Sequence, residues 1–212
     1  MQDERMDVFL NSFMMKQTDF LTSLEEECIK TQVPVIRPQM QSLLRFLITL
    51  HKPLRILEVG CAIGYSSILM AEYSLEESHI TTIEKYEKRI PLAHENIKAA
   101  GFEHKITLLE GDAFEILREL EKPFDFIFMD AAKAQYINFL PDVVRLLNPG
   151  GLLVSDNILQ EGDLLESRFA VTRRNRTIHA RMREYLYEIT HHKQLETVIL
   201  PVGDGVTLSV RK

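Results

Sequence analysis

The chain has 212 residues, of which 45% are hydrophobic, and it carries a formal net charge of −6 with a pI near 5.7. This length favours one α/β domain, and the apolar fraction is sufficient for one large core. The negative charge weighs mildly against a non-specific nucleic-acid binder, because such proteins are usually basic.

The sequence indicates a cytoplasmic protein with reduced thiols. No apolar run reaches the length of about 18 residues that a membrane-spanning helix needs, so we expect no membrane partner. Residues 1–9 are charged and lack the apolar stretch of a secretion signal. Cys28 and Cys61 form neither a disulfide framework nor a metal-ligand spacing.

The first fifty residues are expected to form a helical cap (1–50). Residues 7–29 have apolar side chains at helical spacing, and Thr18 can break or cap this run to give two short helices. Segment 33–38 contains two prolines and is therefore extended, and a helix over 38–50 begins at Pro38. Appended helices of this kind usually cover a sheet edge or a partner subunit.

From residue 54 onward, strand patterns alternate with helix patterns, and residues 51–212 are expected to form one α/β core. The expected strands are 54–59, 80–84, 106–110, 124–129, 152–155, 195–200 and 206–210, with helices at 87–100, 113–120, 136–147 and 167–191. Alternation with short loops is typical of a parallel, doubly wound, Rossmann-like sheet. The last two strands are joined too tightly for a crossover, so an antiparallel hairpin should close a seven-stranded sheet.

A glycine turn follows the first predicted strand, in the stretch LRILEVGCAIG at 54–64. Gly60 and Gly64 permit a tight turn that should bring backbone N–H groups close to a ligand. Ala62 stands where a dinucleotide-binding loop has its second glycine, so a ligand without a pyrophosphate is favoured. The turn predicts either a nucleoside-containing ligand or a plain connection between strand and helix. It resembles motif I of the class I S-adenosylmethionine-dependent methyltransferases.

Acidic residues follow the next two predicted strands, at the edge of the sheet where ligands bind in such folds. Glu84 comes about 20 residues after the glycine turn and can accept the hydroxyls of a ribose. Asp112 would lie near an adenine, with Ala113 as a small floor. For both acids, capping of a helix N-terminus is the alternative.

A possible cation site follows the fourth and fifth strands. Asp130, Asp156 and Asn157 supply only oxygen ligands, which suit a hard cation such as Mg²⁺ or Ca²⁺. Lys133 follows Asp130 by three residues and could receive the proton of a bound hydroxyl. Taken singly, Asp130 could instead cap a loop and Lys133 could be a solvated surface residue.

The series of motifs resembles the cation-dependent O-methyltransferases, the family of the catechol and caffeoyl-CoA enzymes. The similar stretches are RPQMQ at 37–41, EVGCAIGYS at 58–66, IEKYE at 83–87, GDA at 111–113, FIFMDAAK at 126–133 and NPGGLLVSDNIL at 148–159. The resemblance implies that Asp130, Asp156 and Asn157 bind Mg²⁺ and that Lys133 is the base. It also implies a homodimer and contacts to S-adenosylmethionine from Met40, Glu58, Gly60, Ser66, Glu84, Asp112, Ala113 and Asp130. Periodicity alone would equally place Met40 in the core.

The acceptor is suggested by residues 168–183, which hold six arginines, one histidine and no acid. Arg173, Arg174 and Arg176 could bind phosphates, because the guanidinium fork matches their geometry. The stretch TRRNRTI at 172–178 resembles bacterial members that methylate 5-hydroxyuridine at the tRNA wobble position, which implies the tRNA anticodon loop as partner. A helix whose arginines pair with acids or a second subunit, a small catechol-like substrate, and a non-catalytic nucleotide-binding protein remain alternatives.

Overall fold

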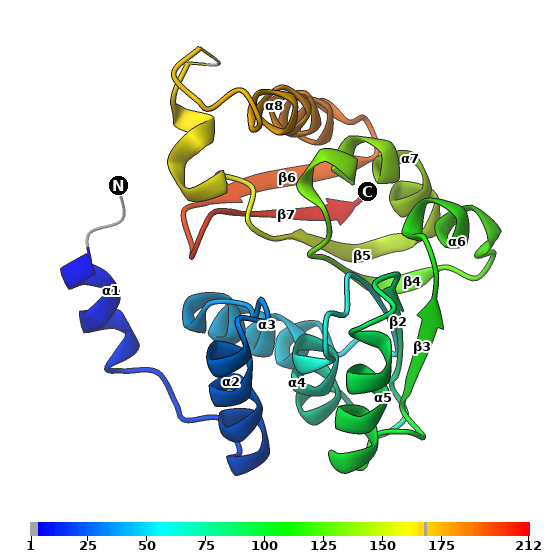
Figure 1. Cartoon of the computed structure of the whole chain (residues 1–212). Helices are drawn as coiled ribbons and strands as arrows, with labels where there is room; N and C mark the ends of the chain where they lie inside the picture. The colour runs from blue at the N-terminus through cyan, green and yellow to red at the C-terminus, as the bar shows by residue number, and fades with distance from the viewer. Residues whose placement is uncertain (1–3, 168) are drawn as a thin grey trace.

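A computed structural model describes residues 4–167 and 169–212 of the chain (Figure 1). The helices are α1 Glu4–Asn11, α2 Asp19–Thr31, α3 Pro38–His51, α4 Tyr65–Tyr73, α5 Ile90–Ala99, α6 Ala113–Glu119, α7 Tyr136–Leu146 and α8 Arg176–His191, with short 3-10 helices η1 Lys133–Gln135 and η2 Gln160–Leu165. The strands are β1 Arg55–Val59, β2 His79–Glu84, β3 Ile106–Glu110, β4 Phe124–Met129, β5 Leu147–Ser155, β6 Leu195–Leu200 and β7 Val206–Arg211. None of the described helices is long and apolar enough to cross a membrane.

The strands form one seven-stranded sheet in the order β3-β2-β1-β4-β5-β7-β6. The pairs among β1 to β5 are all parallel, whereas β7 runs antiparallel to both β5 and β6. The predicted fold, including the closing hairpin, is therefore confirmed. The chain passes from β1 outward to β2 and β3 and then returns to β4, so the carboxyl ends of β1 and β4 lie together at the switch point of the sheet.

Alternate residues of the central strands are buried on opposite faces of the sheet. Ile56 of β1 and Phe128 of β4 join a core with α3, α4 and α5, whereas Leu57 and Ile127 join a second core with α6, α7 and α8. The two groups of helices lie on opposite sides of the sheet in Figure 1. Because both faces are covered, the central strands are nearly continuous apolar runs, which explains why they were predictable.

The N-terminal segment forms two helices, as the pattern predicted. Thr18 caps α2 with its hydroxyl oxygen, which accepts a hydrogen bond of 3.4 Å from the Leu21 N–H. Leu21 and Leu24 of α2 are buried in the first core. Helix α1 extends away from the body of the molecule in Figure 1, and both Phe9 of α1 and Phe13 in the turn after it are exposed.

The largest errors in the predicted boundaries lie at the starts of α8 and β5. Helix α8 begins at Arg176 rather than at residue 167, because the Asn175 and Ala170 N–H groups bond within local turns and Asn175 Nδ2 donates to Asp163 Oδ2 at 2.8 Å. Strand β5 begins at Leu147 rather than at residue 152, because the stretch expected only to end a helix continues into the sheet through a register shift against β4. Gly151 permits this path, since a Cβ there would lie 2.8 Å from the Asn148 carbonyl oxygen.

Candidate active site

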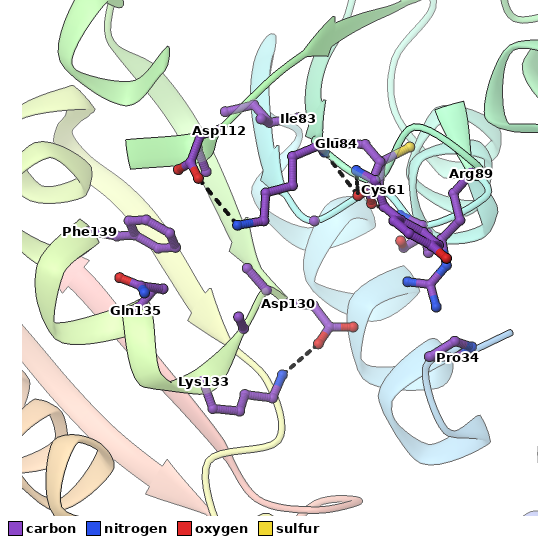
Figure 2. Close-up of a pocket in the computed structure, with 18 of the residues that line it drawn as sticks. Pro34, Cys61, Ile83, Glu84, Arg89, Asp112, Asp130, Lys133, Gln135 and Phe139 are labelled. Carbon is purple, nitrogen blue, oxygen red and sulfur yellow. Dashed lines mark hydrogen bonds and ion pairs between the residues drawn. The ribbon is translucent and has the colours of Figure 1, made fainter. Parts of the chain in front are cut away.

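A cavity of about 840 Å³ opens at the carboxyl ends of the parallel strands. Its wall is formed by the residues that follow β1, β2, β3 and β4, together with the extended segment 34–36 that precedes α3. Figure 2 shows Glu84, Asp112, Asp130 and Lys133 around this space. The cavity lies where ligands bind in open α/β sheets, and its volume is in the range of small-molecule sites.

Gly60 lies where the turn after β1 meets the loop after β4. Its φ is +104°, and a Cβ at this position would overlap the Asp130 carbonyl oxygen and lie 2.9 Å from the carbonyl carbon. The prediction that the turn presents its N–H groups to a ligand was wrong for the first three of them, because these groups bond within the protein. The Gly60 and Cys61 N–H groups donate to the Ile83 carbonyl at 3.1 Å each, and the Ala62 N–H donates to Glu84 Oε2 at 2.8 Å. The absence of a side chain at Gly60 therefore allows the end of β1 to pack closely against the end of β4.

Glu84 lines the cavity at the end of β2, where a ribose was predicted to bind. Its carboxylate accepts hydrogen bonds from the N–H groups of Ala62, Lys85 and Tyr86 at 2.8 to 2.9 Å. It does not cap the next helix, because α5 has Arg89 at its N-cap position. The structure therefore excludes the capping alternative for α5, and the ribose contact stays a prediction.

Asp112 is the N-cap of α6 and also lines the cavity, so the capping alternative describes its local role. Its Oδ1 accepts from the Phe114 N–H at 2.9 Å, and its Oδ2 pairs with Lys85 Nζ at 3.2 Å (Figure 2). The Phe114 hydrogen bond and then Lys85 hold the pKa of Asp112 below its usual value. Ala113 follows in the cavity wall. The Lys85 contact was not predicted.

The side chains predicted to bind a cation lie together. Asp130 Oδ1 accepts from Lys133 Nζ at 2.7 Å and from Asn157 Nδ2 at 3.2 Å, and Asp156 Oδ1 accepts from the Asn157 N–H at 2.7 Å. Asp156 is buried, and burial together with the charge of Asp130 raises its pKa to about 7. In residues 4–167 and 169–212, no group of three His, Cys, Asp or Glu side chains could hold a metal ion. The predicted set instead combines two aspartates with an asparagine.

These oxygens fit a hard divalent cation. Two carboxylates lie at adjacent strand ends, one of them buried, and Lys133 pairs with Asp130 alone. A bound divalent cation would add positive charge beside both carboxylates. Asn157 adopts a left-handed conformation with φ +56°, which brings its side-chain amide to Asp130. The donor chemistry therefore agrees with the predicted cation site.

Tyr136 is a site residue that sequence reasoning missed. Its hydroxyl lies 3.1 Å from Lys133 Nζ, 2.8 Å from the Met129 carbonyl oxygen and 3.1 Å from the Asp156 carbonyl oxygen. The residue is fully buried, and this burial raises the pKa of its phenol well above the usual value. The only signal in the sequence was its position three residues after Lys133.

Glu58, Ser66 and Met40 occupy three different environments. Glu58 is fully buried at the end of β1, where its Oε2 accepts hydrogen bonds from the Ser67 and Thr82 hydroxyls. Its Oε1 has no hydrogen-bond partner, and burial raises its pKa to about 7. Ser66 lines the cavity, whereas Met40 is packed in the first core and is absent from the cavity wall. The core-facing alternative thus describes Met40.

The described arginines of the 168–183 run lie outside the cavity wall. Arg173 and Arg174 are exposed in the turn before α8, and Arg176, at the start of α8, is half-buried with an Nε that has no hydrogen-bond partner. Arg181 donates to the Ala134 carbonyl at 3.1 Å, and Arg183 donates to the Leu164 carbonyl at 3.2 Å. These two arginines have intramolecular roles. Arg168 lies outside the described residues.

Comparison with known proteins gives consistent matches along the chain. Residues 11–212 match a family model described as O-methyltransferase. A catechol O-methyltransferase from Niastella koreensis is 31% identical over 169 residues, which cover 77% of this chain and 76% of the relative. A structure of a candidate caffeoyl-CoA O-methyltransferase from Staphylococcus aureus has 29% identity and a TM-score of 0.91, over 99% of this chain and all (100%) of the other. A methyltransferase from Podospora anserina, solved with S-adenosylhomocysteine, has 26% identity and a TM-score of 0.89 over 99% and 94% of the two chains.

Proposed function

Because this chain belongs to the O-methyltransferase family, we propose that it transfers a methyl group from S-adenosylmethionine to a cation-chelated hydroxyl group. The proposed acceptor is the 5-hydroxyl of 5-hydroxyuridine at the wobble position of tRNA, and the proposed cation is Mg²⁺. One observation carries the proposal: oxygen ligands from two adjacent strand ends and the Lys133 amine lie together beside a cavity of about 840 Å³.

Residues in and beside the cavity would have separate roles in the proposed reaction. Glu84 would bind the ribose of the methyl donor, and Asp112 would lie near its adenine. Asp130, Asp156 and Asn157 would hold the cation, which when bound supplies Lewis-acid chemistry that favours ionisation of an acceptor hydroxyl. Lys133 would accept the hydroxyl proton.

The transfer balances without a further reactant. The bond between sulfur and the methyl carbon breaks, a bond between the acceptor oxygen and that carbon forms, and the sulfonium becomes a neutral thioether. The proton of the hydroxyl goes to the amine of Lys133, which lies 2.7 Å from Asp130 Oδ1 and is thereby held beside the cation ligands. Rate enhancement would come mainly from the fixed positions of donor, acceptor and base.

Exposed positive charge supports a tRNA acceptor. Arg173 and Arg174 are both exposed and adjacent on a protein whose net charge is −6, so they form a local reversal of the overall charge. An anticodon loop is single-stranded, so one base can enter a pocket while arginines bind the flanking phosphates. The 5-hydroxyl and the C4 carbonyl of 5-hydroxyuridine offer two neighbouring oxygens for chelation.

A small catechol or phenylpropanoid is the second candidate acceptor. The compared proteins include a catechol O-methyltransferase and a candidate caffeoyl-CoA O-methyltransferase. Arg181 and Arg183 bond to carbonyl groups of the same chain, so part of the arginine run has a structural use that does not require RNA.

The experiment compares tRNA bearing 5-hydroxyuridine with a simple catechol, using labelled S-adenosylmethionine and Mg²⁺. Label in tRNA that disappears with a chelator would support the tRNA proposal, and label in the catechol alone would support the second candidate. Label in tRNA that persists with a chelator would contradict the proposed dependence on a cation.

Paired charge variants test the RNA contacts. Replacing Arg173 and Arg174 by Ala should lower the slope of log affinity against log salt by about 1 to 2. Replacing Lys98 and Lys122 by Ala removes the same charge from other exposed positions and should leave the slope unchanged. Equal slopes in both double variants would contradict a role for the arginines.

We also propose a cytoplasmic homodimer. Cys28 and Cys61 are both free thiols, as expected in a reducing compartment. Phe9 of α1 and Phe13, two residues after the end of α1, are exposed and supply an apolar surface that a second subunit could cover. Sedimentation of the purified protein would test the dimer, and a monomer at micromolar concentration would contradict it.

A further inference from the structure

We propose that Tyr136 is a positioning residue that directs the Lys133 amine toward the acceptor hydroxyl. The inference rests on the proposed function, because it takes Lys133 as the proton acceptor. It assigns a role in the reaction to a fully buried side chain that does not line the cavity.

The Tyr136 hydroxyl lies directly behind the predicted cation ligands. It is 2.8 Å from the carbonyl oxygen of Met129, the residue before Asp130. It is also 3.1 Å from the carbonyl oxygen of Asp156, the residue before Asn157. A single hydroxyl therefore contacts the backbone of both strand ends that carry the site.

The direction of each hydrogen bond follows from chemistry. Carbonyl oxygens only accept, so the single phenolic proton of Tyr136 is donated to Met129 or Asp156. The oxygen can then act only as an acceptor toward Lys133 Nζ, which lies 3.1 Å away. Lys133 must therefore direct an N–H bond at Tyr136.

This arrangement orients the amine. The Lys133 nitrogen has three positions besides its bond to carbon. Asp130 Oδ1 at 2.7 Å and Tyr136 Oη at 3.1 Å are both acceptors and fix two of these positions as N–H bonds. The third position is left for a group in the cavity, which Lys133 lines. Without the tyrosine oxygen, one N–H bond has no fixed partner, and the amine can rotate its third position away from the acceptor.

Tyr185 provides a matched control. It is also fully buried, its ring packs edge-on against Tyr136 with centroids 5.4 Å apart, and its hydroxyl bonds to Ser155 Oγ at 2.6 Å. Tyr136→Phe and Tyr185→Phe each remove one buried hydroxyl from the same cluster and keep the ring. Only the first removes a partner of Lys133.

The experiment measures kcat, KM for S-adenosylmethionine and the melting temperature of both variants, with whichever acceptor the wild type methylates. Tyr136→Phe should lower kcat about tenfold or more, as expected for a misdirected base, with KM within about twofold. Tyr185→Phe should keep kcat within about twofold while losing a similar amount of thermal stability. Equal changes in kcat for the two variants would overturn the proposal.

A failure of the proposed function would be seen separately. If the wild type methylates neither tRNA nor a catechol, the proposed function is contradicted, and crystal structures of the two variants then decide the role of Tyr136. Displacement of Lys133 Nζ from Asp130 or a new side-chain rotamer in Tyr136→Phe alone would support the positioning role. An unchanged Lys133 would overturn it.

Discussion

Gly60→Ala should damage the site through the backbone of Asp130. Two effects add at this position. The first is conformational: φ is +104°, and a left-handed backbone destabilises an alanine by about 1–2 kcal/mol relative to glycine. The second is steric, because the new Cβ would lie 2.9 Å from the Asp130 carbonyl carbon and 3.2 Å from Ala131 Cα.

The steric effect determines the loss of activity. Carbon atoms in contact are separated by about 3.5–4.0 Å, so the loop after β4 must move by about 0.6–1.1 Å away from β1. That loop carries Asp130, and Lys133 follows it. A misplacement of about 1 Å can lower a rate about 100-fold, so we expect kcat/KM to fall by a factor of about 10 to 100.

Gly101→Ala is the matched control, because Gly101 has φ +78° but a Cβ there would meet no atom within 4 Å. It should lower the melting temperature by about 2–8 °C through conformational strain, with kcat/KM unchanged. Thermal unfolding and methyl transfer would be measured on both variants. If Gly60→Ala matches Gly101→Ala in both quantities, the close approach of β1 to the Asp130 loop does not have the importance assigned to it.

Three further results are expected. Asp156→Ala should abolish cation-dependent transfer but leave S-adenosylhomocysteine binding intact by calorimetry; full activity would contradict the cation site. Glu58 has a folded-state pKa of about 7 against 4.5, so the native state binds more protons between these values and the free energy of unfolding should fall by about 3 kcal/mol as pH rises from 4.5 to above 7. Glu58→Gln should flatten this part of the stability curve in urea unfolding, and an equally steep curve would refute the assignment. Lys105 is buried and donates to the Ala71 and Ser74 carbonyls at 2.9 and 3.3 Å. Lys105→Met should therefore lower the free energy of unfolding by about 1–3 kcal/mol. A loss below about 0.5 kcal/mol would contradict a stabilising role for these two hydrogen bonds.

The strands and the general location of the site were predictable from local patterns. β1 and β4 are buried on both faces, so each is a short apolar run that ends in a recognisable glycine or acid. In a parallel sheet the carboxyl ends of such strands share one edge, and this topology alone predicted that Asp130 and Asp156 lie together. Topology, rather than the chemistry of single residues, made the site predictable.

The features that were missed depend on contacts between distant segments. Nothing in residues 169–175 forbids a helix, and the start of α8 depends on the contact between Asn175 and Asp163 in η2. Tyr136 has the pattern of an ordinary core aromatic, and only the folded chain brings its hydroxyl to two strand ends. The partners of Arg181 and Arg183 are likewise carbonyl groups of other segments, so their role could not be separated from that of Arg173 within one charged run.

The turn between β6 and β7 supports the site, so we expect the site to form late in folding. The N–H groups of Ile158 and Leu159, directly after the predicted cation ligands, donate to the carbonyls of Gly205 and Asp204 at 3.1 and 2.9 Å. A chain folded only as far as β5 would hold Asp130 beside Asp156 and leave this loop without its support. Contacts over such sequence separations form slowly, because their loop-closure entropy is lost before they stabilise the chain. A competent site therefore requires the docked hairpin, and partly folded chains should not carry out methyl transfer.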